Sequence, residues 1–410
     1  MRMSNKKEIV PKLRFPEFIG DKLKITKLGK IFSVVKEKAG ENKYTLMSVT
    51  SGVGLIPQAE KFGREIAGNS YKNYIVIRKY DFAYNKSATK QFPEGYISML
   101  EKYDIAAVPN SIFTCFRITD NEAYPPFFDY LWHNNYHGHW LRKYIEVGAR
   151  AHGALSVDTK HLWSMPLALP DFNEQQKIAD CLSSIDELID AESRKLKALE
   201  KYKKGLMQKL FPAEERILPE WRFPEFRGKN EWRIKPLGKI CANYDSRRIP
   251  ITEKDRVRGK IPYIGASGVI DYINDFIFDE DLLCVSEDGA NLVARTYPIA
   301  FSISGKTWVN NHAHVLKFSY KYTQNIVESY LNMINLQDFL TGMAQPKLNR
   351  AKLDIIPISL PEEEEQQKIS DFLSETDTII KEQSNKVEQL KVHKKGLMQG
   401  LFPSLEEADV

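Results

Sequence analysis

Two long stretches of the chain, residues 169–212 and 360–403, carry an apolar residue at every third or fourth position. A sustained apolar period near 3.5 residues is typical of the seam of a coiled coil. The seam positions are Ile178, Leu182, Ile185, Ile189, Leu196 and Leu199 in the first stretch, and Ile369, Leu373, Ile380, Val387 and Leu390 in the second. Polar residues interrupt the first seam at Glu192 and Lys203 and the second at Gln383 and Lys394. The pattern predicts two long helices.

The two stretches are copies of one another. Without a gap, 24 of the 44 aligned positions are identical, and both copies contain EQQKI and end on KKGLMQ, one variable residue and LFP. The duplication extends further, because RFPEF occurs at residues 14–18 and again at 222–226. A period near 200 residues indicates domain duplication rather than a solenoid, whose repeats are much shorter. Two unrelated amphipathic helices are the alternative, but they would have no reason to share polar gaps and end sequences.

Between the long helices the pattern changes to short strands. Residues 73–83 and 105–118 in the first region are rich in β-branched and aromatic residues, as are residues 260–273, 282–285, 293–303 and 307–318 in the second. A helical pattern follows near the end of each region, at residues 127–147 and 326–340. We therefore expect an α+β fold in which two globular, strand-rich domains alternate with two long helices that pair as an antiparallel coiled coil. The predicted ranges are 1–168 and 213–359 for the domains, and 169–212 and 360–410 for the helices with the C-terminal tail.

Length and composition argue against a single-domain protein and against a membrane-spanning one. The 410 residues are too many for one ordinary core, and the hydrophobic content of 42% with 28% charged residues is that of a globular protein. A net charge of +5 permits a polyanionic partner without requiring one. The four cysteines lack CxxC spacing, which favours reduced thiols, and no run reaches the length of a membrane span. We expect a cytoplasmic protein without a membrane anchor.

Motifs for catalysis are weak. The tripeptide at residues 305–307 resembles the end of a phosphate-binding loop, but Ala300 occupies the place of its first glycine. The sequence Tyr-Pro-Pro-Phe that begins at Tyr124 resembles the Asn/Asp-Pro-Pro-aromatic motif of amino-methyltransferases. In that motif an amide or carboxylate accepts a hydrogen bond from the target amine, and Tyr124 supplies neither group. Two histidine groups, at residues 133–139 and 312–314, lack partners at ligand spacing, so structural roles are favoured over metal binding. We predict no catalytic residue, metal or cofactor in this chain.

Side chains suited to nucleic acid are more numerous. Arginine and lysine pair with phosphates and guanine edges, and asparagine and glutamine pair with adenine. The candidates are Asn85, Lys86, Ser87, Lys90, Arg150 and His152 in the first region, and Arg247, Arg248, Lys254, Gln345, Lys347 and Arg350 in the second. For each of them, a solvated surface is the alternative.

The organisation resembles the specificity (S) subunit of type I restriction–modification systems. The resemblance rests on the repeated EQQKI and KKGLMQ helices, the RFPEF starts, DFAYNKS at residues 81–87, NNHAH at 310–314 and AQPK at 344–347. The two halves differ at the last of these motifs: the first half has ARAHGAL at residues 149–155 where the second has AQPK. In members of this family, two target-recognition domains alternate with the repeated helices, and the resemblance covers nearly the whole chain.

The resemblance implies a non-catalytic DNA-binding subunit of a hetero-oligomeric restriction system. Two methylation subunits that bind S-adenosylmethionine would dock on it, and two restriction subunits would use ATP and Mg²⁺. Each domain would recognise one half of an asymmetric site in double-stranded DNA, with one adenine methylated in each half. Paired helices of thirty-odd residues would be roughly 50 Å long, about one and a half turns of B-DNA, and could set the spacing. A coiled-coil assembly or adaptor protein with two ligand-binding domains, and a stand-alone methyltransferase or nuclease, are the alternatives.

Overall fold

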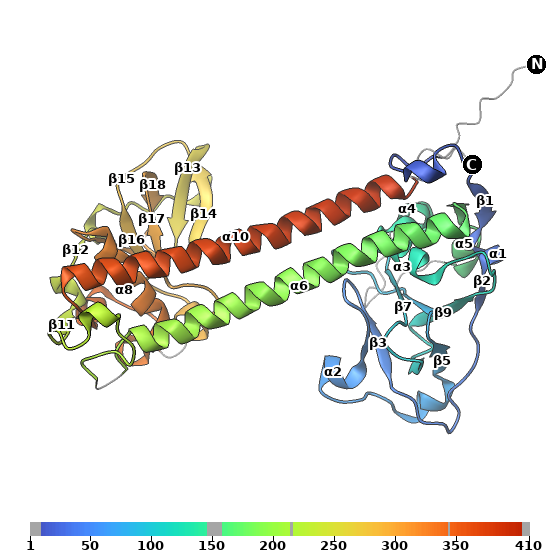
Figure 1. Cartoon of the computed structure of the whole chain (residues 1–410), viewed down its shortest axis with the longest axis horizontal. Coiled ribbons are helices and arrows are strands. Elements are labelled where there is room, and N and C mark those ends of the chain that lie inside the picture. Colours follow the sequence, from blue (N-terminus) through green and yellow to red (C-terminus); the bar gives the residue numbers. More distant parts are fainter. Residues whose placement is uncertain (1–9, 146–157, 214–215, 343–344, 404–410) are drawn as a thin grey trace, which may run out of the picture. The chain divides into compact units, whose positions relative to one another are not determined.

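The computed structural model describes residues 10–145, 158–213, 216–342 and 345–403. The chain forms two compact units, Met1–Glu192 with Lys386–Val410, and Ser193–Asn385. Each unit therefore contains one strand-rich region and parts of both long helices (Figure 1). In the part of the chain that the structure describes, no helix is both long enough and apolar enough to span a bilayer.

The first unit is built on a four-stranded antiparallel sheet with the order β2-β9-β6-β7. These strands are β2 (Phe32–Val34), β9 (Phe113–Ile118), β6 (Phe82–Asn85) and β7 (Tyr96–Met99). Three antiparallel pairs join β1 (Lys24–Lys27) to β10 (Pro166–Leu169), β3 (Met47–Thr50) to β4 (Gly54–Pro57), and β5 (Ile75–Arg78) to β8 (Ile105–Val108). The short helices are α1 (Leu28–Ile31), α2 (Gln58–Phe62), α3 (Pro125–His133), α4 (Tyr136–Leu141) and α5 (Thr159–Trp163).

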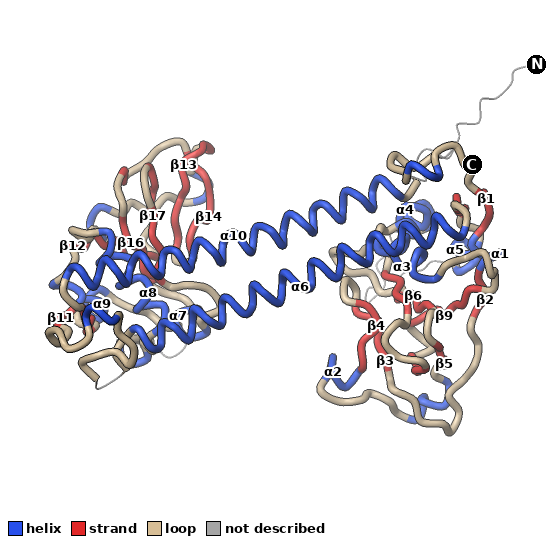
Figure 2. The backbone as a smooth tube through the Cα atoms, in the orientation of Figure 1, coloured by secondary structure: helices blue, strands red, loops and turns tan. Residues whose placement is uncertain are grey.

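The second unit repeats this sheet. Its strands β12 (Ala242–Asn243), β19 (Ala313–Lys317), β16 (Leu282–Ser286) and β17 (Ala300–Ile303) pair antiparallel in the order β12-β19-β16-β17. A second four-stranded sheet, β14-β13-β18-β15, contains β14 (Gly268–Ile273), β13 (Arg258–Gly265), β18 (Lys306–Val309) and β15 (Phe278–Asp279), and β11 (Arg233–Pro236) pairs with β20 (Pro357–Leu360). The short helices are α7 (Asn291–Ala294), α8 (Lys321–Met333) and α9 (Arg350–Asp354). Figure 2 shows the strands and helices of each unit.

The two long helices are α6 (Phe172–Leu210) and α10 (Glu363–Leu401). In the first unit, Lys386 pairs with Glu192 at 2.5 Å and Lys394 with Asp186 at 2.6 Å, so the two helical segments run in opposite directions. In the second unit, Lys203 pairs with Asp377. The apolar and polar seam positions named from the sequence are all buried or partly buried along both helices. Positions at this spacing lie on one stripe of each helix, so their burial indicates that each helix makes its contacts along that stripe.

Each unit has an apolar core against which these helices pack. In the first, the rings of Phe32, Phe82, Phe116 and Trp132 are buried at the centre, and Leu182 of α6 and Leu401 of α10 belong to the same cluster. In the second, the corresponding cluster joins strands of the β16 sheet to Leu210 of α6 and to Ile369 and Leu373 of α10. The helix ends are thus fixed by burial in the domains themselves.

Several expected strands are interrupted by turns. The strand expected at 73–83 is two strands, β5 and β6, because Tyr80 adopts a φ of 72° and the buried Asp81 accepts a hydrogen bond from the Arg78 amide. The strand expected at 260–273 is the β13–β14 hairpin, with Gly268 at a φ of 108°. The range 293–303 begins in α7. The helix expected at 127–147 is broken into α3 and α4 where Asn135 has a φ of 57°.

Candidate nucleic-acid interface

Each RFPEF segment is fastened to the first turn of a long helix. The Arg14 guanidinium donates two hydrogen bonds to Glu174 of α6, at 2.7 and 2.6 Å, and Arg222 makes the same pair with Glu365 of α10, at 2.7 Å each. Both carboxylates are nearly fully buried. A bidentate arginine–carboxylate pair fixes direction as well as distance. The pair therefore sets each globular domain at a defined angle to the helix that follows it.

The sequence analysis used RFPEF only as a marker of duplication and missed this contact. Lys177 and Lys368, in the two EQQKI copies, extend it by pairing with Glu17 and Glu225 at 2.9 and 3.5 Å. The sequence did contain a signal for this contact. RFPEF and EQQKI both occur twice, and in each copy the arginine and glutamate of RFPEF have a glutamate and a lysine of EQQKI as possible partners.

In the first unit, the last residue of β6 and the loop after it supply four of the candidate residues. Asn85 is 9% exposed, and its amide donates to the Val49 carbonyl while its oxygen accepts from the Ser87 amide. Internal hydrogen bonds thus occupy the Asn85 side chain. Lys86 and Ser87 are partly buried and Lys90 is exposed, so the cations of this loop are accessible to a phosphate. Arg150 and His152 lie outside the described residues.

In the second unit, the candidates Arg247, Arg248 and Lys254 have different surroundings. Arg247 is exposed and lies over the rings of Tyr244 and Phe278, 4.5 and 4.8 Å from their centroids. Arg248 is largely buried and donates to Glu287 at 2.7 Å and to the Ala313 carbonyl at 2.8 Å. Lys254 is exposed. The structure therefore gives Arg248 an internal role and leaves Arg247 and Lys254 at the surface.

The loop before α9 carries the remaining candidates. Gln345 is exposed, and the Lys347 ammonium lies 3.2 Å from Glu287 with half of its side chain exposed. Arg350 is also exposed and lies 3.5 Å from Asp354, one turn further along α9. Backbone hydrogen bonds of 2.8 Å in both directions join Lys347 to Thr341. These backbone hydrogen bonds hold Lys347 in place, with its ammonium at the surface.

A buried network of charged side chains lies against this loop. His314 on β19 is 1% exposed, with Nδ1 2.6 Å from an Asp245 oxygen and Nε2 2.7 Å from the Leu348 carbonyl oxygen. Burial raises the pKa of Asp245, but the hydrogen bonds from His314 and the Val315 amide, together with the charges of His314 and Arg248, outweigh burial and lower that pKa. Burial likewise raises the pKa of Glu287, and the hydrogen bonds from Arg248 and Lys347, together with the charges of His314 and Arg248, reverse the effect and lower that pKa. Both carboxylates are therefore ionised at neutral pH.

Asp245, Glu287 and His314 place their ligand atoms within 4.8 Å of one another, a spacing that could hold a metal ion. Ion pairs account for the arrangement instead, because Arg248 contacts both carboxylates and both ring nitrogens of His314 are engaged. His312 differs from His314. It lies in the turn before β19, half exposed, and hydrogen-bonds to Asp288 at 2.8 Å. The two histidines therefore have different surroundings.

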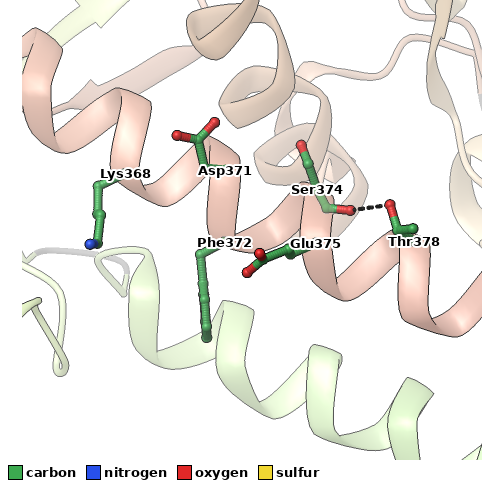
Figure 3. A pocket seen from close by; sticks show the side chains of 6 residues that line it. All are labelled: Lys368, Asp371, Phe372, Ser374, Glu375 and Thr378. Atoms are coloured by element: carbon green, nitrogen blue, oxygen red, sulfur yellow. Dashed lines mark hydrogen bonds between the residues drawn. The ribbon is translucent and has the colours of Figure 1, made fainter.

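The other motifs weighed for chemistry have structural surroundings. Gly305, with a φ of 67°, turns the chain between β17 and β18, so no helix follows it to hold a phosphate. Tyr124 precedes the first turn of α3, and its ring packs on Phe172. His137 is buried, whereas His133 stacks on Tyr96 at the surface of α3. Figure 3 shows the side chains that line a pocket, which all belong to α10: Lys368, Asp371, Phe372, Ser374, Glu375 and Thr378.

The fold defines the class of protein. It contains two strand-rich domains, each fixed to the start of a long helix and each presenting basic side chains on its loops. A family model described as the type I restriction modification DNA specificity domain matches residues 19–201 and again residues 229–389. The two matches cover most of the chain, and the chain therefore belongs to this family.

Individual proteins agree with the family match. A Haemophilus influenzae protein named as a type I restriction enzyme specificity subunit is 35% identical over 131 residues, 32% of this chain and 33% of that protein. A Methanocaldococcus jannaschii protein named as the MjaX specificity subunit of a type I restriction enzyme is 26% identical over 264 residues, 62% of each. The chain thus matches less than two thirds of the length of these curated relatives. The crystal structure of a type I restriction-modification S subunit from M. genitalium has the same fold, with a TM-score of 0.59 and 15% identity over 96% of this chain and 99% of that one.

Proposed function

We propose that this chain is the DNA-recognition subunit of a type I restriction–modification complex. One observation carries the proposal: a family model for DNA specificity matches the chain twice, once in each half. In each half the match includes a sheet of the same strand order, with loops that carry exposed lysines. Each unit would bind one half of a bipartite target.

The two halves of the target would differ in sequence. The first residue after β6 is Lys86, whereas the first after β16 is Glu287. Because sequence is recognised by side chains at base edges, surfaces with different charge and hydrogen-bonding groups select different bases. An asymmetric target follows.

The long helices would pair as an antiparallel coiled coil that sets the spacing of the half-sites and docks the methylation subunits. Burial of the seam positions and the ion pairs between α6 and α10 within each unit support the pairing. Equal lengths of 39 residues favour pairing along their whole extent. A rigid helical pair is a suitable spacer because its length changes only by insertion or deletion.

In this proposal, the partner subunits carry out the methylation and cleavage reactions. Two methylation subunits would bring S-adenosylmethionine to one adenine in each half-site, and two restriction subunits would supply ATP- and Mg²⁺-dependent cleavage. This chain would be non-catalytic and would act in the cytoplasm, where its DNA substrate is found. The charged groups it buries are arranged as ion pairs that position loops, which suits a binding role.

Mapping methylated adenines across the genome, with and without the gene for this chain, tests the proposal. We expect a single bipartite, asymmetric motif that is methylated only when the chain is present. Exchanging residues 219–355 for the equivalent region of another family member should then change one half of that motif and leave the other unaltered. Unchanged methylation after deletion, with the chain still bound to other proteins, would instead favour the assembly or adaptor role.

A further inference from the structure

We propose that His314, held as a doubly protonated imidazolium, is a positioning residue for the loop at residues 345–347, and that its two hydrogen bonds control base selectivity at one half-site only. This inference rests on the proposed function, because it takes that loop to contact DNA. It adds a specificity-determining residue that touches no DNA itself.

Hydrogen-bond geometry defines the protonation state of His314. A backbone carbonyl can only accept, so Nε2 must donate to the Leu348 oxygen at 2.7 Å. Asp245 already accepts from the Val315 amide at 2.9 Å and pairs with Arg248, so it is an ionised acceptor for Nδ1 at 2.6 Å. Only the form with a proton on both ring nitrogens satisfies both partners. The side chain is 1% exposed, so water cannot replace a lost hydrogen bond.

The network is joined directly to the loop. Leu348, whose carbonyl accepts from His314, donates its own amide to the Glu287 carbonyl at 2.8 Å. The Glu287 carboxylate pairs with Lys347, and the Pro346 carbonyl accepts from the Gly289 amide at 3.1 Å. A neutral His314 would leave either Leu348 or Asp245 without its donor. The loop would then lose one of the contacts that hold Gln345 and Lys347 in register with the domain.

Charges from every neighbouring element act on His314. Asp245 and Arg248 approach from the segment after β12, Glu287 from the end of β16, and Lys347 from the loop itself. The two carboxylates favour the imidazolium and the two cations oppose it. His312 also lies near this loop, where it pairs with Asp288, and it is half exposed. It therefore provides a control for a histidine that does not hold the loop.

The first unit provides an internal control within the same chain. Thr114 occupies the place of His314, and Lys86 follows the central strand where Glu287 does in the second unit. The pairs that His314 and Glu287 make in the second unit therefore have no counterpart at these positions of the first unit. The half-site bound by the first unit should be recognised equally well with and without the His314 side chain.

The experiment is selection of target sequences from random double-stranded DNA by the full chain in complex with its methylation subunits. We expect preference for the correct bases in one half-site to fall about tenfold in His314→Gln, the scale of one good base contact, while the other half-site is unaffected. His312→Gln should retain the selectivity of the parent at both half-sites.

Equal changes in both half-sites of His314→Gln, or no change in either, would overturn the inference and leave the proposed function intact. If the parent complex enriches no sequence, the proposed function fails, and the inference fails with it. Should His314→Gln not fold, Asp245→Asn gives a second variant, which removes the charge of the acceptor for Nδ1 and should lower selectivity at the same half-site only. Ring ¹⁵N NMR of the DNA-free chain at about pH 6.5 should show two protonated nitrogens on His314, and a single protonated nitrogen would contradict the assignment.

Discussion

At the scale of single residues, burial decides what a polar side chain can do. Asn85 and Arg248 have the chemistry of DNA-contacting residues, but hydrogen bonds inside their domains occupy both. Lys86, Gln345 and Lys347 remain at or near the surface. A residue type therefore indicates a possible contact, and the packing of its own domain determines whether the group is available for it.

His137 should make the first unit sensitive to acid. Burial lowers its pKa to about 4, and its Nδ1 is without a hydrogen-bond partner. The unfolded chain, with a histidine pKa near 6.5, binds the proton more readily than the folded one between these values. Stability is therefore fully present above about pH 6.5 and should fall as the pH drops to about 4, by about 3 kcal/mol. Urea unfolding at a series of pH values measures this.

The control for that prediction is a second histidine on the same helix. His137→Gln should reduce the pH dependence in this window, whereas His139→Gln, at an exposed position of α4, should keep the slope of the parent. Equal slopes for the parent and His137→Gln would show that His137 is not the group responsible.

Lys86 tests the DNA-contacting surface of the first unit. If its ammonium neutralises a phosphate, Lys86→Ala should weaken binding of every DNA sequence alike and reduce the slope of log affinity against log salt by about 1. Fluorescence anisotropy of the complex on its target at several salt concentrations measures that slope. Lys24, which is paired with Glu122 at 2.7 Å, is the matched control, and Lys24→Ala should leave the slope unchanged. An unaltered slope in Lys86→Ala would assign this lysine to the solvated surface.

At the scale of elements, the long helices owe their stability to packing against the domains. Their surface ion pairs contribute little, since partly exposed pairs are worth about 0–1 kcal/mol each. The stabilising contacts are apolar, and they recur in both units because Leu182 in the first and Leu373 in the second occupy equivalent places in α6 and α10.

Leu182→Ala should therefore destabilise the first unit by about 2–5 kcal/mol, the cost of a cavity in a well-packed core. Leu188 lies on the same helix but is 43% exposed, so Leu188→Ala should have little effect on stability. Thermal unfolding followed by circular dichroism compares the two variants. A loss of stability as large in Leu188→Ala as in Leu182→Ala would contradict the assignment of the buried face.

At the scale of the whole molecule, the proposed role of the helices can be tested by changing their length. One heptad inserted between Glu192 and Ser193, and another between Asn385 and Lys386, adds about 10 Å to each helix and keeps the apolar seams in phase. The unspecified spacer of the target should then grow by about three base pairs, at roughly 3.4 Å each, with both half-sites unchanged. Methylation mapping measures the spacer length. A spacer of the original length, or an altered half-site, would contradict the role of the helices as a ruler.

The sequence by itself determined the long helices and the duplication. A periodic apolar pattern acts over many turns, so each position adds to the same signal, and the predicted 169–212 and 360–403 stretches contain α6 and α10. It also supplied the resemblance to the family that the matches to both halves bear out. Strand content was predicted too, but several predicted strands are divided by turns at residues such as Tyr80 and Gly268.

Tertiary structure alone decided which side chains meet. The pair between Arg14 and Glu174 joins residues 160 positions apart, and the network at His314 draws on four separate segments of the chain. Contacts of this kind depend on how the strands are ordered in space and on the ionisation that burial and neighbouring charges impose. No local pattern encodes them, because each group acquires its partner, and its charge state, only when the sheet and the loops around it have formed.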